Sequence, residues 1–418
     1  MTVSADTVVE AAKRLEGVVA TTPLERNARL SERFGADIWL KREDLQGVRS
    51  YKVRGAYNLI AQLTPEQRAA GVVAASAGNH AQGVAYACSV LGVRGRLYLP
   101  LGTPLQKRQR IAALGGDWVE IVLTGETYDE AKAASNEAAV RDGSTPVPAF
   151  DDDRTIAGQG TVVCEIVEQL GREPDSLVIP VGGGGLLAGS LAWLTEHAPG
   201  ITVHGVEPAG ATCVAAALEA GHPVTLPRID TFVDGAAVSR AGDLTYPIIA
   251  AAVSAAETIM SSVPEGRVCS EMLELYQADG IIAEPAGALA TAALGTAVPV
   301  EAGSTVVCIV SGGNNDVSRY ADIVERALVF EGRKHYFLVE FPQEPGALRK
   351  FLDEVLGPND DITLFEYIKR SNRETGPALV GIELSDAADL PELLARMDAA
   401  PPQIERLDPA TQLFRFLV

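Results

Sequence analysis

Residues 177–197 read LVIPVGGGGLLAGSLAWLTEH, and this stretch decides the fold. A β-branched apolar run is followed by four consecutive glycines and then by an apolar helical pattern that begins near Leu186. Consecutive glycines allow several backbone N–H groups to point inward with a helix N-terminus behind them, and this arrangement suits a phosphate group. A glycine-rich turn that only eases tight packing is the alternative from this stretch alone.

The same alternation of strand and helix patterns extends from about Ile38 to Val310. Short β-branched runs that end in Gly, Pro or Ser alternate with Ala-rich helical patterns, which predicts parallel sheets covered by helices. Ligands of such sheets gather at the carboxyl ends of the strands. The glycine spacing fits neither a Walker loop nor the G-x-G-x-x-G fingerprint, so it argues against nucleotide binding.

The pattern changes after residue 331. A strand, a helix, two strands, a helix and a strand are predicted at 335–341, 344–356, 362–369, 377–384, 389–397 and 412–418. This order is typical of a ferredoxin-like α+β domain. We predict a catalytic domain over 1–331, with a smaller subdomain nested at about 42–145, and a second domain over 332–418.

Composition narrows the possible partners. Lys and Arg number 35 against 55 Asp and Glu, so the formal charge of −20 disfavours nucleic acid and anionic membranes. Five scattered cysteines without a CxxC pair predict free thiols in a reducing compartment. No export segment is evident at the N-terminus, and the weakly charged stretch 285–300 is too short to span a bilayer, so we expect a cytoplasmic protein.

A second motif is SYKVRGAYN at residues 50–58. Lys52 lies between Tyr51 and Val53, and a desolvated amine in such surroundings gains nucleophilic character. A solvated surface lysine is the alternative.

A third motif, ASAGNHAQG at residues 75–83, is a small polar loop that opens into a helix. Free N–H groups around Gly78 to His80 suit a carboxylate. Simple helix capping by Ser76 and Asn79 is the alternative.

The fourth motif is CIVSGGNND at residues 308–316, in which Ser311 follows a buried strand. A hydroxyl in this place serves either a ligand at the strand end or the closure of a turn.

Together these motifs resemble the fold-type II pyridoxal-phosphate enzymes, and specifically the biosynthetic threonine dehydratases. The resemblance spans nearly the whole chain, through TPLERNARLSERFGADIWLKREDLQ (22–46), FDDDRTIAGQGTVVCEI (150–166), EPAGALA (284–290) and SGGNND (311–316). It implies two parallel-sheet subdomains, pyridoxal 5'-phosphate as cofactor and a C-terminal ACT-like domain.

The resemblance also implies residue roles. Lys52 is the Schiff-base lysine, Asn79 contacts the cofactor ring hydroxyl and Ser311 faces the ring nitrogen. The phosphate loop comprises Gly182, Gly183, Gly184, Gly185 and Leu186. The substrate carboxylate lies near Ser76, Gly78 and His80, and further segments near the substrate and ring contain Gly235, Ala236 and Glu284.

A metal site is not predicted. Some relatives coordinate a cation near the segment that matches Glu207, Ala211 and Cys213, but they carry an acidic residue where Cys213 stands. Hard divalent ions prefer oxygen ligands, so the thiol argues against Mg²⁺ or Ca²⁺ here.

The implied reaction is the dehydration and deamination of L-threonine to 2-oxobutanoate and ammonia, the first step of isoleucine biosynthesis. Isoleucine is the implied inhibitor, valine is a candidate opposing effector, and the turn Glu344 to Ala347 could hold an effector carboxylate. The expected assembly is a homotetramer or a homodimer. The alternatives are a serine or threonine racemase, a serine dehydratase, a catalytically degenerate amino-acid sensor and, for the C-terminal domain, a dimerisation module without ligand.

Overall fold

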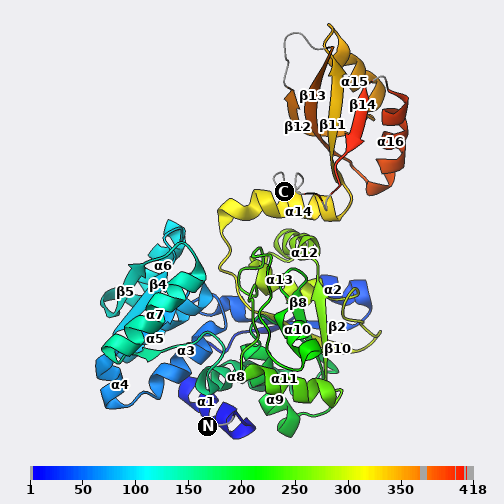
Figure 1. Cartoon of the computed structure of the whole chain (residues 1–418). Helices are drawn as coiled ribbons and strands as arrows, with labels where there is room; N and C mark the ends of the chain where they lie inside the picture. The colour runs from blue at the N-terminus through cyan, green and yellow to red at the C-terminus, as the bar shows by residue number, and fades with distance from the viewer. Residues whose placement is uncertain (1–2, 368–373, 401, 409–410, 412–418) are drawn as a thin grey trace. The chain divides into compact units, whose positions relative to one another are not determined.

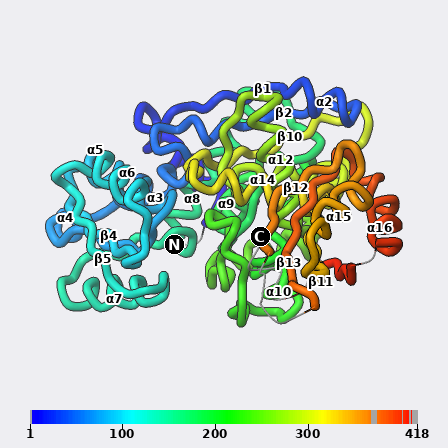
Figure 2. Tube along the Cα trace, turned by 90° about the horizontal axis from the view of Figure 1, so that it is seen from above, coloured from blue at the N-terminus to red at the C-terminus, as the bar shows by residue number. Residues whose placement is uncertain are grey.

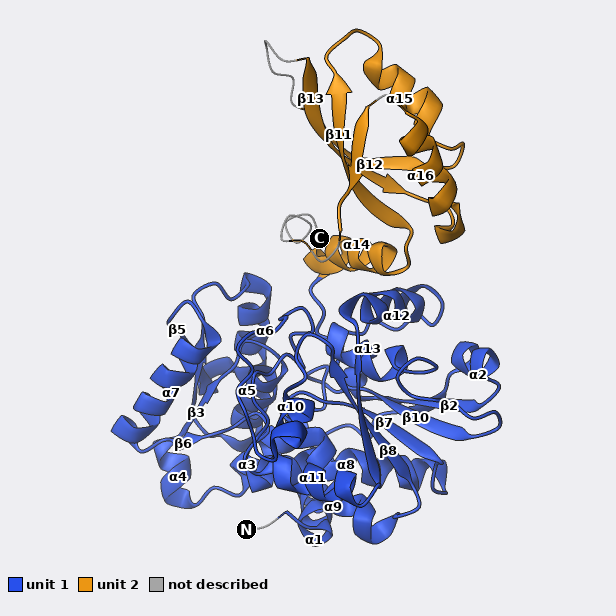
Figure 3. Cartoon of the chain, turned by 45° about the vertical axis from the view of Figure 1, so that its right-hand side comes forward, with its two compact units in different colours: residues 1–316 blue, residues 317–418 orange. Residues whose placement is uncertain are grey.

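The chain separates into two compact units, residues 1–316 and 317–418 (Figure 3). The computed structural model describes residues 3–367, 374–400, 402–408 and 411. Helix α14 (Tyr320–Phe330) groups with the second unit, whereas the predicted boundary lies after residue 331. That domain boundary stays a prediction.

The first unit contains a six-stranded sheet with the order β1-β2-β10-β7-β8-β9. Neighbouring strands pair in parallel, except that β1 pairs antiparallel with β2 at one edge. The strands are β1 (Leu24–Arg26), β2 (Asp37–Arg42), β7 (Ser176–Pro180), β8 (Thr202–Pro208), β9 (Thr258–Val263) and β10 (Thr305–Val310). The adjacent strands β7 and β10 are almost wholly buried, because helices cover both faces.

Helices α8, α9 and α11 lie on one side of this sheet, and α12 and α13 lie on the other (Figure 1). The helices of this part are α1 (Ala5–Leu15), α2 (Ala28–Phe34), α8 (Asp153–Leu170), α9 (Gly185–His197), α10 (Cys213–Ala220), α11 (Thr245–Ser254), α12 (Glu265–Gln277) and α13 (Pro285–Ala292). The stretch 177–197 comprises most of strand β7, the glycine loop and helix α9, as predicted.

A smaller parallel sheet has the order β5-β4-β3-β6. Its strands are β3 (Val72–Ala75), β4 (Gly95–Leu99), β5 (Val119–Leu123) and β6 (Thr145–Pro146), and its helices are α4 (Pro65–Ala70), α5 (Asn79–Leu91), α6 (Leu105–Gly115) and α7 (Tyr128–Asp142), with η2 (Gly116–Trp118) after α6. Helix α3 (Lys52–Ala61) contacts both α5 and α8, so it joins the two sheet systems (Figure 2). The predicted fold class, with two parallel-sheet subdomains, is confirmed.

The second unit has the ferredoxin-like order that the sequence predicts, with an antiparallel sheet β12-β13-β11-β14. Its elements after α14 are β11 (Lys334–Pro342), α15 (Ala347–Val355), β12 (Asp361–Tyr367), β13 (Thr375–Glu383), α16 (Leu390–Ala399) and β14 (Gln403–Arg406), with η3 (Val317–Arg319) and η4 (Ala387–Asp389). The closing strand predicted at 412–418 lies outside the described residues. The strand at β14 was not predicted, because QIER lacks an apolar alternation.

Two further predictions concern thiols and apolar segments. None of the five cysteines, all of which lie within the described residues, forms a disulfide, and four of them are buried. Within the described ranges, we find no helix with the length and hydropathy needed to cross a bilayer. The stretch 285–300 begins with α13, whose residues are all buried, as predicted for a core helix.

Candidate active site

Lys52 is the first residue of α3, and its side chain is half-buried. Its Nζ atom donates a hydrogen bond of 3.0 Å to the carbonyl of Ala149 and lies 5.1 Å from the ring centre of Tyr51. The amine is therefore partly enclosed rather than fully solvated. This placement fits the predicted reactive lysine better than a surface lysine.

The backbone around Ser311 is tied directly to the residues that precede Lys52. The N–H of Tyr51 donates to the Ser311 carbonyl at 3.2 Å, and Ser50 forms an antiparallel bridge with Gly312. Ser311 is buried, and its Oγ donates to the Ala286 carbonyl at 3.1 Å. The end of β10 thus meets the start of α3, and the second and fourth motifs belong to one site.

Asn79 begins α5, but its side chain does not cap that helix. Its Nδ2 atom donates to Glu284 Oε1 at 2.5 Å, and its Oδ1 atom accepts a hydrogen bond of 2.7 Å from the amide of Asn314. Glu284 is buried, and Asn314 also donates to the Val48 carbonyl. The capping alternative is wrong for Asn79, because its amide joins α5 to residues on the far side of the site.

The loop before α5 presents backbone N–H groups. Gly78 is the N-cap residue without a side-chain cap, and its own N–H donates to Ser76 Oγ at 3.2 Å. The pKa of His80 is lowered to about 4, first by burial and second by the charge of Lys52, so the imidazole is neutral at pH 7. Its Nε2 atom contacts the Val147 carbonyl at 2.7 Å, which makes Nε2 the N–H donor and leaves Nδ1 as an acceptor. A carboxylate is therefore better served by the backbone N–H of His80 than by its ring.

The glycine loop packs closely against Phe150, the residue that follows the Lys52 acceptor. A Cβ atom at Gly183 would lie 2.4 Å from a Phe150 ring carbon, and one at Gly185 would lie 2.8 Å from Phe150 Cβ. Gly184 has φ 92°, a left-handed conformation that glycine adopts most easily. Both space and backbone conformation therefore require glycine in this loop.

The donor set of this loop suits a phosphate group. Within the described part of the chain, no acceptor receives a hydrogen bond from the backbone N–H groups of residues 182–186. The carbonyls of Gly182 and Gly183 instead accept from Cys213 Sγ and from Thr245 Oγ1. Carbonyls engaged elsewhere and free N–H groups at the start of α9 make an anion cradle.

The two segments that were expected near the substrate adjoin this cradle and Asn79. A Cβ at Gly182 would lie 3.0 Å from the Ala236 carbonyl, and one at Gly235 would lie 3.5 Å from Glu284 Oε1. The neighbouring Asp234 forms an ion pair of 2.9 Å with Lys107 of α6. The loop around Gly235 therefore connects the larger subdomain to the smaller one.

A cavity of about 420 Å³ lies beside Asn314. Arg49 and Lys107 supply positive charge. Gln82 Oε1 and both amide atoms of Asn315 lack hydrogen-bond partners within the described residues. A larger cavity, about 470 Å³, lies beside α1 and is lined by none of the predicted site residues. Proximity to Asn79 makes the smaller cavity the better route for a polar ligand.

Glu284 has a strongly perturbed carboxyl group. Its pKa is raised to about 7, first by burial and second by the negative charge of Asp234. Because the unfolded carboxyl titrates near 4.5, its contribution to stability is fully present below pH 4.5 and is lost as the pH rises through about 7.

We expect Glu284→Gln to remove this pH dependence. Between pH 4.5 and 8, the free energy of unfolding of the unsubstituted protein should fall by roughly 3 kcal/mol more than that of the variant. Urea unfolding followed by tryptophan fluorescence measures this difference, since all three tryptophans lie in the first unit. Glu168→Gln on the exposed side of α8 is the control, and parallel curves for Glu284→Gln and the unsubstituted protein would contradict the assignment.

Glu207 and Cys213, which were considered as metal ligands, form hydrogen bonds to backbone groups instead. The carboxylate of Glu207 accepts from the N–H groups of Val214 and Ala215 at 2.7 and 2.9 Å, and so caps α10. Burial, with the Glu207 charge, raises the pKa of the Cys213 thiol to about 12, so this side chain is a neutral thiol at neutral pH. Among the described residues, no three His, Cys, Asp or Glu side chains group as a metal site. The absence of a metal stays a prediction.

Chelation tests that prediction. We expect dialysis against EDTA to change the turnover rate by less than about twofold, because the described residues contain no group of three His, Cys, Asp or Glu side chains that could hold a cation. Cys213→Asp is the matched variant, and it should make the rate respond to added Mg²⁺ by placing a second carboxylate beside Glu207. Loss of activity in EDTA with recovery in Mg²⁺ by the unsubstituted protein would overturn the prediction.

Phe150 and Asn314 complete the site but were not predicted. Asn314 lies in the quoted motif SGGNND, and an amide just after a functional strand end was an available signal. Phe150 begins the quoted segment 150–166, but its local sequence does not indicate contact with the glycine loop, because that contact joins distant residues.

Comparison with known proteins agrees with this geometry. Residues 15–312 match the family model described as pyridoxal-phosphate dependent enzyme, and residues 325–417 match the C-terminal regulatory domain of threonine dehydratase. A relative in Mycobacterium tuberculosis, L-threonine dehydratase biosynthetic IlvA, is 61% identical over 98% of this chain and 94% of its own length.

Solved structures show the same fold. The processed form of threonine deaminase isoform 2 from Solanum lycopersicum has a TM-score of 0.70 and 37% identity, over 78% of this chain and 95% of that one. Maize serine racemase also has a TM-score of 0.70, with 29% identity over 79% of this chain and 99% of its own. Because two family models match in chain order and the bacterial relative aligns along nearly its whole length, this chain belongs to the biosynthetic L-threonine dehydratase family of pyridoxal-phosphate-dependent enzymes.

Proposed function

We propose that this protein converts L-threonine to 2-oxobutanoate and ammonia, with pyridoxal 5'-phosphate as its cofactor. The observation that carries the proposal is the convergence of Lys52, Asn79, Ser311 and the glycine loop on one site. The net reaction balances, because threonine loses water and the resulting imine takes up water as ammonia leaves. Bound pyridoxal phosphate supplies an electron sink that stabilises negative charge at the substrate Cα.

The residues of this chain would bind the cofactor and transfer the proton. With the cofactor bound, the N–H groups of Gly182 to Leu186 would hold its phosphate, Asn79 would bind its ring hydroxyl and Ser311 would serve its ring nitrogen. Lys52 Nζ would hold the cofactor covalently, and as a free amine it would accept the proton from the substrate Cα. A hydroxyl partner such as Ser311 favours less positive charge on the ring than a carboxylate would, which suits elimination over transamination.

The substrate carboxylate fits the start of α5. The backbone N–H groups of Asn79 and His80 open this helix, and Ser76 and Gly78 form the loop in front of it. These groups are the predicted substrate contacts. Neutral His80 adds no charge of its own, so selectivity for a carboxylate rests on N–H groups, the helix end and the nearby Lys52.

The C-terminal unit supports feedback regulation. It matches a regulatory domain model, and we propose that isoleucine inhibits through it while valine opposes isoleucine. Gly346, with φ 93°, is the N-cap of α15, and this supports an effector site at the turn Glu344 to Ala347. The segment that carries Ser311 and Asn314 ends at Asp316, where the second unit follows, so the chain itself links the two functions. A cytoplasmic homotetramer or homodimer is part of the proposal.

Incubation of the purified full-length protein with L-threonine tests the function. We expect formation of 2-oxobutanoate and ammonia in equal amounts, slower formation in the presence of isoleucine, and relief of that inhibition by valine. A parallel assay replaces threonine with L-serine and detects pyruvate. Faster formation of pyruvate from serine than of 2-oxobutanoate from threonine would identify a serine dehydratase. If the protein binds the cofactor and converts L-serine to D-serine but forms no keto acid, it is a racemase. If it forms neither a keto acid nor D-serine, the result favours an amino-acid sensor.

A further inference from the structure

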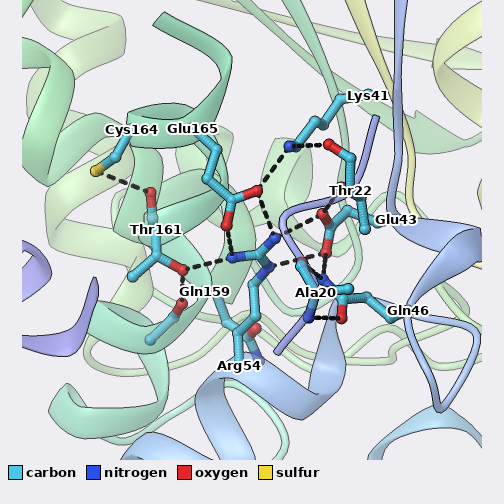
Figure 4. A network of polar contacts seen from close by, with 12 residues as sticks. Ala20, Thr22, Lys41, Glu43, Gln46, Arg54, Gln159, Thr161, Cys164 and Glu165 are labelled. Carbon is cyan, nitrogen blue, oxygen red and sulfur yellow. Dashed lines mark hydrogen bonds and ion pairs between the residues drawn. The ribbon is translucent and has the colours of Figure 1, made fainter. Parts of the chain in front are cut away.

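A buried cluster of charged side chains lies behind Lys52. Lys41, Glu43 and Arg54 are each 0% exposed, and the side chain of Glu165 is 17% exposed. Figure 4 shows Arg54 between the two carboxylates, with Lys41 on the far side of Glu165. Two positive and two negative groups make the cluster neutral, which is the condition under which charges are tolerated in a core.

Arg54 uses every donor that it has. Its Nε and Nη2 atoms donate to the two oxygens of Glu43, both at 2.8 Å. Its Nη1 and Nη2 atoms donate to the two oxygens of Glu165, at 2.6 and 2.9 Å, and Nη1 also donates to Thr161 Oγ1 at 3.2 Å. A guanidinium has five N–H groups in a rigid plane, so its orientation is fully determined here.

The second cation completes the neutralisation of Glu165. Lys41 Nζ donates to Glu165 Oε2 at 2.6 Å, to the Thr22 carbonyl at 2.8 Å and to Gln169 Oε1 at 2.8 Å. Burial opposes the charge on Arg54, but the carboxylates of Glu43 and Glu165 raise the pKa of its guanidinium above the ordinary value. Arg54 therefore stays charged at any pH at which the protein is folded.

The cluster joins four elements, since Lys41 lies in β2 and the other three residues lie in η1 (Glu43–Leu45), α3 and α8. Glu43 lies in η1, directly after β2, and Glu165 lies in α8, while Arg54 is in the first turn of α3. A cation near a helix N-terminus opposes the helix dipole, so Arg54 is not explained by the stability of α3 itself. A buried ion pair is also weak evidence for stability. What the cluster does determine is where the first turn of α3 lies.

Backbone packing at the same turn leaves little freedom. A Cβ on Gly158 of α8 would lie 2.6 Å from the Arg54 carbonyl, and a Cβ on Gly83 of α5 would lie 3.0 Å from the Lys52 carbonyl. Two helices therefore touch the α3 backbone through glycines. The position of this backbone decides where the Lys52 amine lies relative to Ala149 and the glycine loop.

We propose that Arg54 is a positioning residue for Lys52: by binding Glu43 and Glu165 with four N–H groups and Thr161 with the fifth, it sets the first turn of α3 and so the position of the reactive amine. The inference rests on the proposed function for the role of Lys52 as the amine that carries the cofactor and for threonine as the substrate. A displacement of an acting group by about 1 Å can lower a rate up to 10²-fold, so a modest shift of this turn is measurable.

Arg54→Lys in the full-length holoenzyme is the main test. Lysine keeps the charge but has three donors, and it cannot form planar pairs with two carboxylates. We expect kcat for threonine to fall about tenfold, with KM changed by less than about threefold, since only the position of Lys52 changes. We also expect a smaller fraction of cofactor on Lys52, measured without substrate by borohydride reduction and the mass of the labelled peptide.

Arg267→Lys is the matched control. Arg267 is 7% exposed and forms an ion pair of 2.7 Å with Glu271 within α12, so the substitution disturbs a buried arginine away from α3. We expect its kcat and its labelled fraction of Lys52 to equal those of the unsubstituted protein. Thr161→Val replaces Arg54→Lys as the test variant if Arg54→Lys fails to fold, because it removes only one neutral hydrogen bond of Arg54. We expect it to lower kcat and the labelled fraction of Lys52 by about twofold.

The labelling result separates this proposal from the proposed function. Lower labelling in Arg54→Lys supports the positioning role even if threonine proves not to be the substrate. If labelling and kcat in Arg54→Lys match those of Arg267→Lys, Arg54 is only structural and the proposal is overturned. The same conclusion follows if Thr161→Val alone is available and behaves as the unsubstituted protein.

Discussion

Replacing Lys52 by alanine is expected to lower the rate of 2-oxobutanoate formation by at least about 10⁴-fold, the largest effect of any single substitution in this chain. Lys52 Nζ, hydrogen-bonded to the Ala149 carbonyl, is the amine at the meeting point of α3 and the glycine loop. On the proposed function, the substitution removes both the residue that holds the cofactor and the group that accepts the Cα proton. Rates of keto-acid formation with saturating threonine and added pyridoxal phosphate measure the loss.

Two comparisons make the Lys52 result specific. Lys132→Ala, on the exposed face of α7, should retain full activity. Addition of a small primary amine such as ethylamine to Lys52→Ala should restore part of the rate, because the missing group is an amine in an otherwise intact site. Retention of more than a few per cent of the activity by Lys52→Ala would remove this lysine from the mechanism.

Gly183→Ala is expected to weaken the binding of pyridoxal phosphate by about 100-fold. The added Cβ would lie within 2.5 Å of three Phe150 ring carbons, so either the ring or the loop must move. Overpacking of this kind costs about 1–3 kcal/mol, and the upper value corresponds to roughly 100-fold in a dissociation constant. Titration of the cofactor-free protein with pyridoxal phosphate, followed by absorbance, gives the dissociation constant.

Gly102→Ala is the matched control for the loop. A Cβ at Gly102 meets nothing within 4 Å, and its φ is not in the left-handed region, so cofactor affinity should not change. A second comparison is Gly183→Ala combined with Phe150→Leu, which removes the clashing ring and should restore part of the affinity. Equal affinity in Gly183→Ala and the unsubstituted protein would show that the cofactor phosphate is held elsewhere.

The Lys52 and Gly183 substitutions both affect contacts with the segment 149–150. Lys52 donates to Ala149, and Phe150, the next residue, lies against Gly183 and Gly185. The segment 149–150 therefore spaces the reactive amine from the anion cradle. The activity of Gly183→Ala should therefore recover at high cofactor concentration, whereas the activity of Lys52→Ala should not.

The sequence by itself determined the local elements and the chemical character of the site. The run LVIPV, the glycines and the following helix pattern predicted β7, the loop and α9, because a buried parallel strand is continuously apolar and an anion cradle needs backbone N–H groups. The ferredoxin-like order of the second unit was also predicted, since each of its longer strands and helices carries its own period. These features depend on neighbours within a few residues.

Only the tertiary structure decided which side chains meet. Asn79 and Glu284 are 205 residues apart, and Arg54 and Glu165 are 111 apart, so no local pattern pairs them. Arg54 reads as part of a basic surface stretch until Glu43 and Glu165 are seen to enclose it. Likewise, β14 is a strand because it bonds to the free edge of β11. Periodicity tells which face of an element is buried, but the packing of distant elements chooses the partner on that face.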